Sequence, residues 1–218
     1  MSFRPLIVAS AVVAGGMALV SAIALSQLPP GTMLPTHWNA AGQADRFAEA
    51  SYALFLPIVL TIGVSAIMAA LPRIEPLQRN LEGSAPLLRT VWAGCLALFV
   101  AEEAMVAGPP LGWTPPDSLM LVGLGLFLIA IGNTLPKSRP GFFVGIRTPW
   151  AIMDTDNWIA THRFGGWLFA GTGLAIVIVA LLPIDAEDRA GIVTTALLSA
   201  ALTPVLFSYF RWRVTRPR

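Results

Sequence analysis

Residues 51–71 read "SYALFLPIVLTIGVSAIMAAL", a run without a single charged side chain. A helix needs about 20 such residues to cross a hydrocarbon core of about 30 Å. The run is continuously apolar and does not alternate with a period of two, so it predicts a helix rather than a strand of a membrane barrel. This stretch therefore predicts a membrane span.

Five further runs of the same kind lie on either side of it. The mean hydropathy of the chain is +0.71 and only 12% of its residues are charged, against about 25% in a soluble domain. We therefore predict an all-α membrane protein with six transmembrane helices, the other five at about 6–26, 87–107, 118–135, 164–182 and 190–210.

The first run also has features of a signal peptide. Arg4 precedes it, and Ala22-Ile23-Ala24 has the small-x-small form of a cleavage site. Its apolar stretch is longer than a signal core, which favours a retained span. Cys95 is the one cysteine of the chain. It allows no intramolecular disulfide and is expected to be a small buried residue.

The distribution of positive charge predicts the orientation. If the N-terminus is cytoplasmic, only Arg46 and Arg189 fall on the outer side. The positive-inside rule therefore places both termini in the cytoplasm. The remaining basic residues then lie on the inner side: Arg4, Arg73, Arg79, Arg89, Lys137, Arg139, Arg147, Arg163, Arg211, Arg213, Arg216 and Arg218. Because they are scattered along membrane flanks, they do not indicate nucleic-acid binding.

Two connections are long, an outer one at about 27–50 and an inner one at about 136–163. Each follows the first helix of a predicted three-helix half, 1–110 or 111–218, and each contains a Thr-His pair. Three helices repeated in opposite orientation are typical of inverted-topology repeats. We state this relation between the halves as a hypothesis.

Prolines punctuate both long connections. In the outer one, Pro29-Pro30-Gly31 and Pro35 predict an extended chain. In the inner one, a short interfacial helix is expected from Asp154, as its N-cap, to Ala160, with Trp158 and Ile159 facing lipid.

Most of the seven tryptophans are expected to be anchors at the membrane–water interfaces. Trp38 and Trp113 fall on the predicted outer side. The others fall at or near the inner helix ends: Trp92, Trp150, Trp158, Trp167 and Trp212.

The outer connection contains "LPTHWNAAGQADRF". It resembles the signature of a bacterial membrane domain of unknown function, P-x-H-W/F-N-x-x-G-x-x-D. The matching residues are Pro35, His37, Trp38, Asn39, Gly42 and Asp45.

The inner connection and its flanks resemble the SdpI family. The residues that carry the resemblance are Gly132-Asn133, Pro136-Lys137, Gly145, Arg147-Thr148-Pro149-Trp150, Trp158 and His162-Arg163. On a six-helix chain, the two signatures together look like an SdpI-type immunity protein.

This resemblance implies a protein that protects its producer from a secreted peptide toxin. It also implies a bacterial inner-membrane location and, as in the best-known member, retention of a small repressor at the membrane. Ala44 and Gly141 depart from the family pattern, which often has proline and asparagine there. Because of these two departures, three points stay open: the shape of both connections, the identity of the toxin and the presence of a repressor partner.

The outer connection holds one group of candidate recognition residues: His37, Trp38, Asn39 and Asp45. An aromatic ring, an amide and an acid suit the first contact with a toxin arriving from outside, although the same residues also suit loop architecture. One imidazole and one carboxylate are too few for a structural zinc site, so no metal is predicted. Asp45, beside Arg46, is expected to be a turn residue.

Glu102 and Glu103 lie within the third run, near its outer end. Ionisable residues inside a span are costly and are by default functional candidates. Two interpretations stay open. Either a glutamate reaches up to the interface, or the pair forms a proton or cation site with His37 or Arg46.

The inner connection holds candidates for loop fixing or for docking a cytoplasmic partner: Asn133, Arg147, Trp150, Trp158, His162 and Arg163. Arg147 offers a rigid fork of donors for a carboxylate or a lipid phosphate. Together with Asp154 and Asp156, these side chains could form a polar network. His162 is expected to donate and accept hydrogen bonds within the fold.

The sequence has no zinc-protease, nucleophile-elbow, P-loop, CxxC or dinucleotide-binding motif. We therefore predict no enzymatic activity and no cofactor. The expected partners are membrane lipids, a peptide toxin and a small repressor. The alternative function is a small transporter or lipid-handling protein that uses Glu102 and Glu103.

Overall fold

The computed structural model describes residues 3–215, and within this range six helices are long and apolar enough to cross a membrane. They confirm the predicted all-α fold with six spans. Arg216 and Arg218, which the charge count includes, lie outside the described residues. The long helices are α1 (Arg4–Ser26), α2 (Ala50–Ile74), α3 (Gln78–Ala107), α4 (Leu119–Thr134), α6 (Thr155–Leu181) and α7 (Ala186–Thr215).

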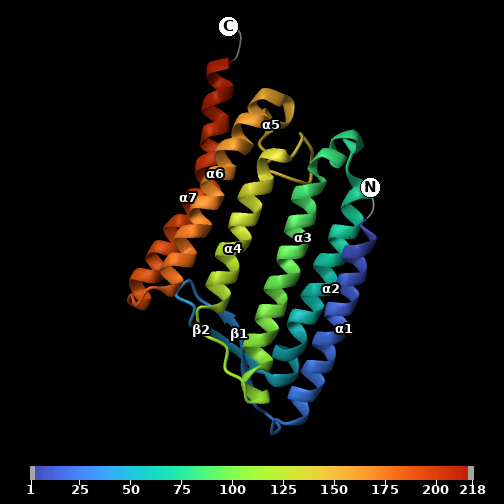
Figure 1. The fold of residues 1–218 in the computed structure, drawn as a ribbon, viewed down its shortest axis with the longest axis vertical. Helices are drawn as coiled ribbons and strands as arrows, with labels where there is room; N and C mark the ends of the chain where they lie inside the picture. The colour runs from blue at the N-terminus through green and yellow to red at the C-terminus, as the bar shows by residue number, and fades with distance from the viewer. Residues whose placement is uncertain (1–2, 216–218) are drawn as a thin grey trace.

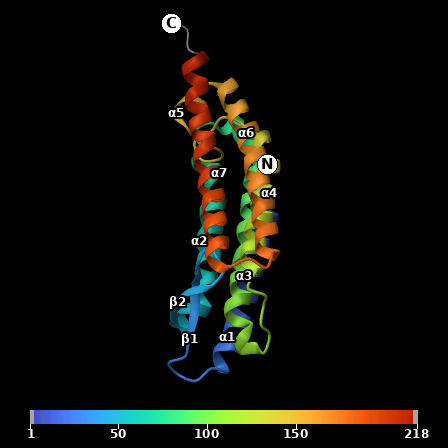
Figure 2. The same cartoon turned by 90° about the vertical axis from the view of Figure 1, so that its left-hand side faces the viewer.

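The helices stand side by side in a bundle that is broad in Figure 1 and narrow in Figure 2. α1, α2 and α3 pack against one another, α3 contacts α4, α4 contacts α6, and α6 contacts α7. Both chain ends lie toward one end of the bundle, which we call the terminal end. The opposite end, which we call the hairpin end, carries a small β-hairpin (Figure 1).

Two helices begin earlier than the hydropathy runs. α3 begins at Gln78 instead of near 87, since Leu81, Ala85 and Leu87 already bury one face of this more polar segment. α6 begins at Thr155 instead of near 164. The expected short helix is therefore the first part of α6, and Asp154 caps it as predicted, because its Oδ1 accepts from the amides of Asp156 and Asn157 at 2.9 and 3.2 Å.

Trp92 lies in the core of the first three helices, with none of its side chain exposed. Its indole Nε1 donates to Ser10 Oγ at 3.0 Å and to Ser65 Oγ at 3.3 Å. The expectation that Trp92 lies in an interfacial belt is therefore wrong. Two serines inside the bundle satisfy its N–H, so the ring has no need of the interface.

Four glycines bring α4 and α6 into backbone contact. A Cβ on Gly132 would lie 2.5 Å from the carbonyl oxygen of Gly166, and one on Gly125 would lie 2.6 Å from that of Gly173. Small residues allow such close approach of membrane helices. We call these four glycines, Gly125, Gly132, Gly166 and Gly173, the glycine seam.

The hairpin consists of β1 (Met33–Trp38) and β2 (Ala44–Glu49), paired antiparallel with irregular register around His37. The chain is extended here, as the prolines predicted, but the strand pairing was not expected. An isolated two-stranded hairpin is marginal in water. This one is supported by Leu34 and Trp38, which pack on a core cluster that includes Ala24, Leu54 and Val106.

Shorter elements connect the helices. A 3-10 turn, η1 (Pro109–Leu111), follows α3, and a second, η2 (Leu135–Lys137), follows α4. A short helix, α5 (Pro149–Met153), precedes α6; Thr148 caps it by accepting from the amide of Ala151 at 3.2 Å.

Candidate functional site at the hairpin end

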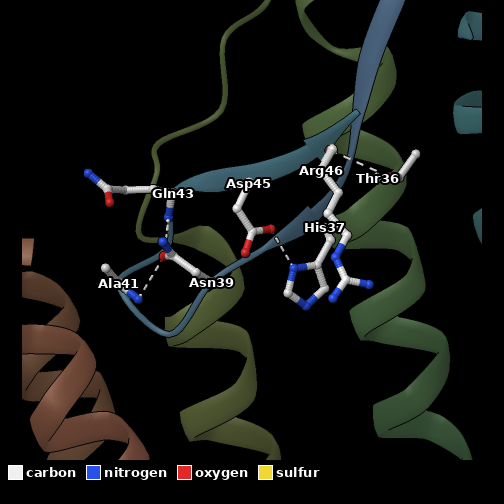
Figure 3. A network of polar contacts seen from close by, with 7 residues as sticks. All are labelled: Thr36, His37, Asn39, Ala41, Gln43, Asp45 and Arg46. Atoms are coloured by element: carbon white, nitrogen blue, oxygen red, sulfur yellow. Dashed lines mark hydrogen bonds and ion pairs between the residues drawn. The ribbon is translucent and has the colours of Figure 1, made fainter. Parts of the chain in front are cut away.

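The turn of the hairpin is built by two residues of the outer signature (Figure 3). Asn39 Oδ1 accepts from the amides of Ala41 and Gln43 at 2.9 and 3.0 Å. Gly42 adopts a φ of 84°, where a side chain would be strained. The N-x-x-G part of the signature therefore closes the turn.

The histidine and the aspartate of the signature face each other across the two strands. His37 Nδ1 lies 2.6 Å from Asp45 Oδ1 (Figure 3), and the two side chains are 50% and 39% exposed. The expectation that Asp45 is a turn residue is wrong, because Asp45 lies in β2 and pairs with the imidazole. The other ring nitrogen, Nε2, has no hydrogen bond within residues 3–215 and is available to a ligand.

An arginine fastens the turn to the helices. Arg189, near the start of α7, donates from Nη1 to the carbonyl of Ala41 at 3.3 Å. Its Nη2 donates to the carbonyls of Leu182 and Ile184 at 3.3 and 3.1 Å. One guanidinium thus joins the hairpin turn to the connection between α6 and α7.

A cavity of about 430 Å³ lies beneath the hairpin. His37, Trp38 and Asn39 line it from the hairpin, and Glu102 lines it from α3. The rest of its wall is mostly apolar and comes from α3, α4 and α7: Leu98, Met120, Leu121, Leu124, Val193 and Leu197. A mostly apolar hollow with a few polar groups is typical of a ligand site.

The two adjacent glutamates occupy different environments. Glu102 is half-buried and lines the cavity with His37. Glu103 is 4% exposed and packs into the α1–α2–α3 core, where its Oε1 lies 2.7 Å from Ser21 Oγ. Ser21 Oγ also lies 2.8 Å from the carbonyl of Leu54. The structure therefore gives Glu102 to the site and Glu103 to the core, and Glu103 does not reach the interface.

At the terminal end, two of the sequence candidates, His162 and Trp158, are packed into the fold. His162 is fully buried, and its Nε2 accepts from the amide of Ile146 at 2.8 Å. Its Nδ1 lies 2.8 Å from the carbonyl of Trp158, and a carbonyl only accepts, so Nδ1 carries the proton. His162 thus donates and accepts within the fold, as predicted.

Trp158 is also fully buried, so the expectation that it faces lipid is wrong. Its ring stacks on His162 with 4.0 Å between centroids, and its Nε1 donates to the carbonyl of Ser138 at 3.2 Å. Gly145 makes this stack possible. It has a φ of 116°, and a Cβ there would lie 2.5 Å from His162 Nε2.

A second buried network was missed in the sequence. Asn157 donates from Nδ2 to the carbonyl of Ser208 at 3.0 Å, and its Oδ1 accepts from Ser208 Oγ and Thr161 Oγ1 at 3.0 and 2.9 Å. Thr148 Oγ1 lies 2.8 Å from Ser208 Oγ. These hydroxyls and the amide join the inner connection, α6 and α7, but single polar residues in apolar runs gave no specific signal.

Glu75 was also missed. It is 3% exposed, just after α2, and its carboxylate accepts from the amides of Leu77, Phe142 and Phe143 at 3.0–3.2 Å. An acid at a helix C-terminus opposes the helix dipole. That unfavourable position was the signal that could have identified it.

The remaining candidates of the terminal end lie at or near the surface. Arg147 is exposed and donates to the carbonyl of Phe142 at 3.0 Å. Trp150 packs against Tyr209 and Trp212, with 5.3 and 5.8 Å between ring centroids. Asn133 and Arg163 are exposed beside the glycine seam and do not join the buried networks.

Together, these features define a multi-pass α-helical membrane protein with a hairpin-covered cavity at one end. Residues 137–208 match the model of the SdpI/YfhL protein family, and residues 12–62 match that of a domain of unknown function, DUF1648. The second match ends in α2 and includes the whole hairpin. These matches agree with the two resemblances found in the sequence.

Among characterised proteins, the chain is similar to "Immunity protein SdpI" of Bacillus subtilis (strain 168). The two are 27% identical over 97 residues, which is 44% of this chain and 46% of the relative. The match thus spans about half of the relative's length. No solved structure matches the chain. These findings support an immunity-type membrane protein.

Proposed function

We propose that this protein protects the cell that makes it from a secreted, membrane-active peptide, which it binds at the hairpin end. The proposal includes a bacterial inner-membrane location with both termini in the cytoplasm, so that the hairpin faces the side from which the peptide arrives. The similarity to an immunity protein supports the class of function.

The observation that carries the proposal is the cavity beneath the hairpin. It is lined by His37, whose Nε2 is unengaged within the described residues, and by Glu102. Met33 and Phe47 add apolar surface to the hairpin, being 54% and 56% exposed. An amphipathic peptide requires apolar contact together with a few polar partners.

Survival under peptide challenge tests this function. A Bacillus subtilis strain lacking its own immunity protein SdpI would express this chain and be exposed to medium conditioned by the parent strain. We expect survival with the unchanged protein and at least tenfold fewer survivors with His37→Ala. Gln43→Ala is the matched control, because Gln43 is exposed on the same hairpin and, within residues 3–215, forms hydrogen bonds through its backbone atoms only.

All variants are compared at equal membrane abundance. Absence of protection by the unchanged protein would overturn the proposed function against this peptide. Equal protection by the His37→Ala and Gln43→Ala variants would support the protective function but show that the imidazole does not take part in recognising the peptide.

The proposed function extends to holding a small cytoplasmic repressor at the terminal end. Arg147 is exposed there next to two exposed aromatic side chains, Phe142 and Phe143. A basic and apolar surface of this kind is suited to an acidic, amphipathic helix. Toxin-dependent membrane recruitment of a fluorescent repressor, lost with Arg147→Ala, would support this extension.

A second candidate function is transport, and Glu102 is the observation that favours it. A carboxylate inside a span that lines a cavity with a histidine is suited to bind a proton or a cation. Purified protein in liposomes would then show pH-driven flux that Glu102→Gln abolishes. Peptide protection by the Glu102→Gln variant would separate the two functions.

A further inference from the structure

A second cavity, of about 640 Å³, lies between α4 and α6 near the terminal end. Its apolar part is formed by Leu126, Ile129, Ala130 and Ala170. Gly132 and Gly166 of the glycine seam also line it. Because these glycines have no side chains, the helices meet at the backbone, and the flanking residues form the walls of a groove.

The polar end of this groove is formed by three exposed side chains: Asn133 of α4, and Arg163 and Trp167 of α6. Trp167 is 84% exposed. The Arg163 guanidinium makes no hydrogen bond or ion pair within residues 3–215. A charge beside an apolar groove on a membrane span requires water or an anionic partner.

We propose that this groove binds one anionic phospholipid. The phosphate of the headgroup is held by Arg163, with Asn133 beside it, and an acyl chain lies along the apolar part of the groove. A guanidinium matches a phosphate with two parallel hydrogen bonds. The Trp167 indole is suited to the headgroup level.

The orientation predicted from the charges supports an anionic occupant. The end of the molecule that carries Arg163 is the predicted cytoplasmic end, to which the charge count assigns every basic residue within residues 3–215 except Arg46 and Arg189. By the positive-inside rule this end faces the cytoplasmic leaflet, which carries anionic lipids. A peptide toxin plays no part in this argument, which shares with the proposed function only the orientation predicted from the charges.

Native mass spectrometry of the purified, delipidated full chain tests the site. The protein is titrated with phosphatidylglycerol and with phosphatidylcholine of the same acyl chains. We expect one phosphatidylglycerol to bind about tenfold more tightly than phosphatidylcholine, because the choline ammonium of phosphatidylcholine offsets the charge of its own phosphate and is repelled by Arg163. Arg163→Gln should bring the two affinities together.

Three further variants separate the effects of charge, of the apolar groove and of the guanidinium shape. Arg73→Gln removes an exposed charge at the end of α2, away from the groove, and should leave both affinities unchanged. Ala130→Phe fills the exposed wall of the groove and should weaken both lipids while leaving the preference for the anionic one. Arg163→Lys keeps the positive charge but loses the planar set of guanidinium donors, and it should lose part of the preference for phosphatidylglycerol over phosphatidylcholine.

Thermal unfolding without lipid shows that each variant is folded before it is titrated. Equal affinities of the unchanged protein for the two lipids would overturn the proposal. So would a folded Arg163→Gln variant with unchanged preference, or self-association that occupies the groove and is not reversed by lipid.

Discussion

The two ends of the molecule each contain a Thr-His pair, but they use the histidine in opposite ways. At the hairpin end, His37 is half-exposed and has one ring nitrogen without a hydrogen bond in the described chain. At the terminal end, His162 is fully buried and both ring nitrogens are engaged. The comparison teaches that burial and unused hydrogen-bonding capacity, and not residue type, separate a contact site from a structural one.

The largest effect expected from this comparison comes from the same substitution at both histidines. His162→Ala should lower the free energy of unfolding by about 4 kcal/mol, because it removes a buried ring and two hydrogen bonds. His37→Ala should change it by less than about 1 kcal/mol, as for other exposed pairs. Chemical unfolding in detergent micelles measures both, and equal losses would contradict the comparison.

Glu75→Ala tests the terminal end at a second place, the connection between α2 and α3. Three backbone amides lose a charged acceptor, so we expect a loss of about 3 kcal/mol and an unfolding midpoint lower by roughly 10 °C. The matched control is Glu82→Ala, an exposed acid in α3. A midpoint shift no larger than the control's would show that this end tolerates the loss of its buried acid.

Gly145→Ala probes the stack of Trp158 on His162. A methyl group at this position would clash with the His162 imidazole, and the backbone is held at positive φ. We therefore expect the free energy of unfolding to fall by about 2 kcal/mol. Tryptophan fluorescence and thermal unfolding would both report the change. Gly171→Ala, in α6 with open space around it, should be neutral or stabilising; an equal response of the two glycines would remove the steric argument.

Asn39→Ala should have a small effect on stability that is confined to the hairpin. Two hydrogen bonds close the turn, and about 1 kcal/mol is lost with them. Trypsin cleavage after the exposed Arg46 should then be about fivefold faster, with the global unfolding midpoint nearly unchanged. Gln43→Ala should cleave like the unchanged protein, whereas a matching rise would assign the effect to the turn as a whole.

The six spans were predictable from the sequence because the hydrocarbon core imposes both length and composition on a crossing segment. The early starts of α3 and α6 were not predictable. The first turns of α3 are stabilised by tertiary contacts of Leu81, and the first turn of α6 is stabilised by the Asp154 cap. Hydropathy carries no information on such contacts. The relation between the two predicted halves remains a hypothesis.

Within the site, the outer signature identified His37, Asn39 and Asp45 but not their arrangement. A strand pairing depends on register, and here the register is irregular around His37 while Leu34 and Trp38 pack on the helices. Trp158 and Trp92 were misplaced for a similar reason. An indole N–H is satisfied either by the interface or by a buried acceptor, and the sequence does not distinguish the two.

The glycine seam has a consequence for how a stimulus could cross the membrane. Its two contact points are about two helical turns apart on each helix. Sliding α4 along α6 by one turn would bring side chains against backbone at both points, so the pair resists shear. Movement at the hairpin end would therefore tilt α4 and α6 together against the neighbouring helices α3 and α7.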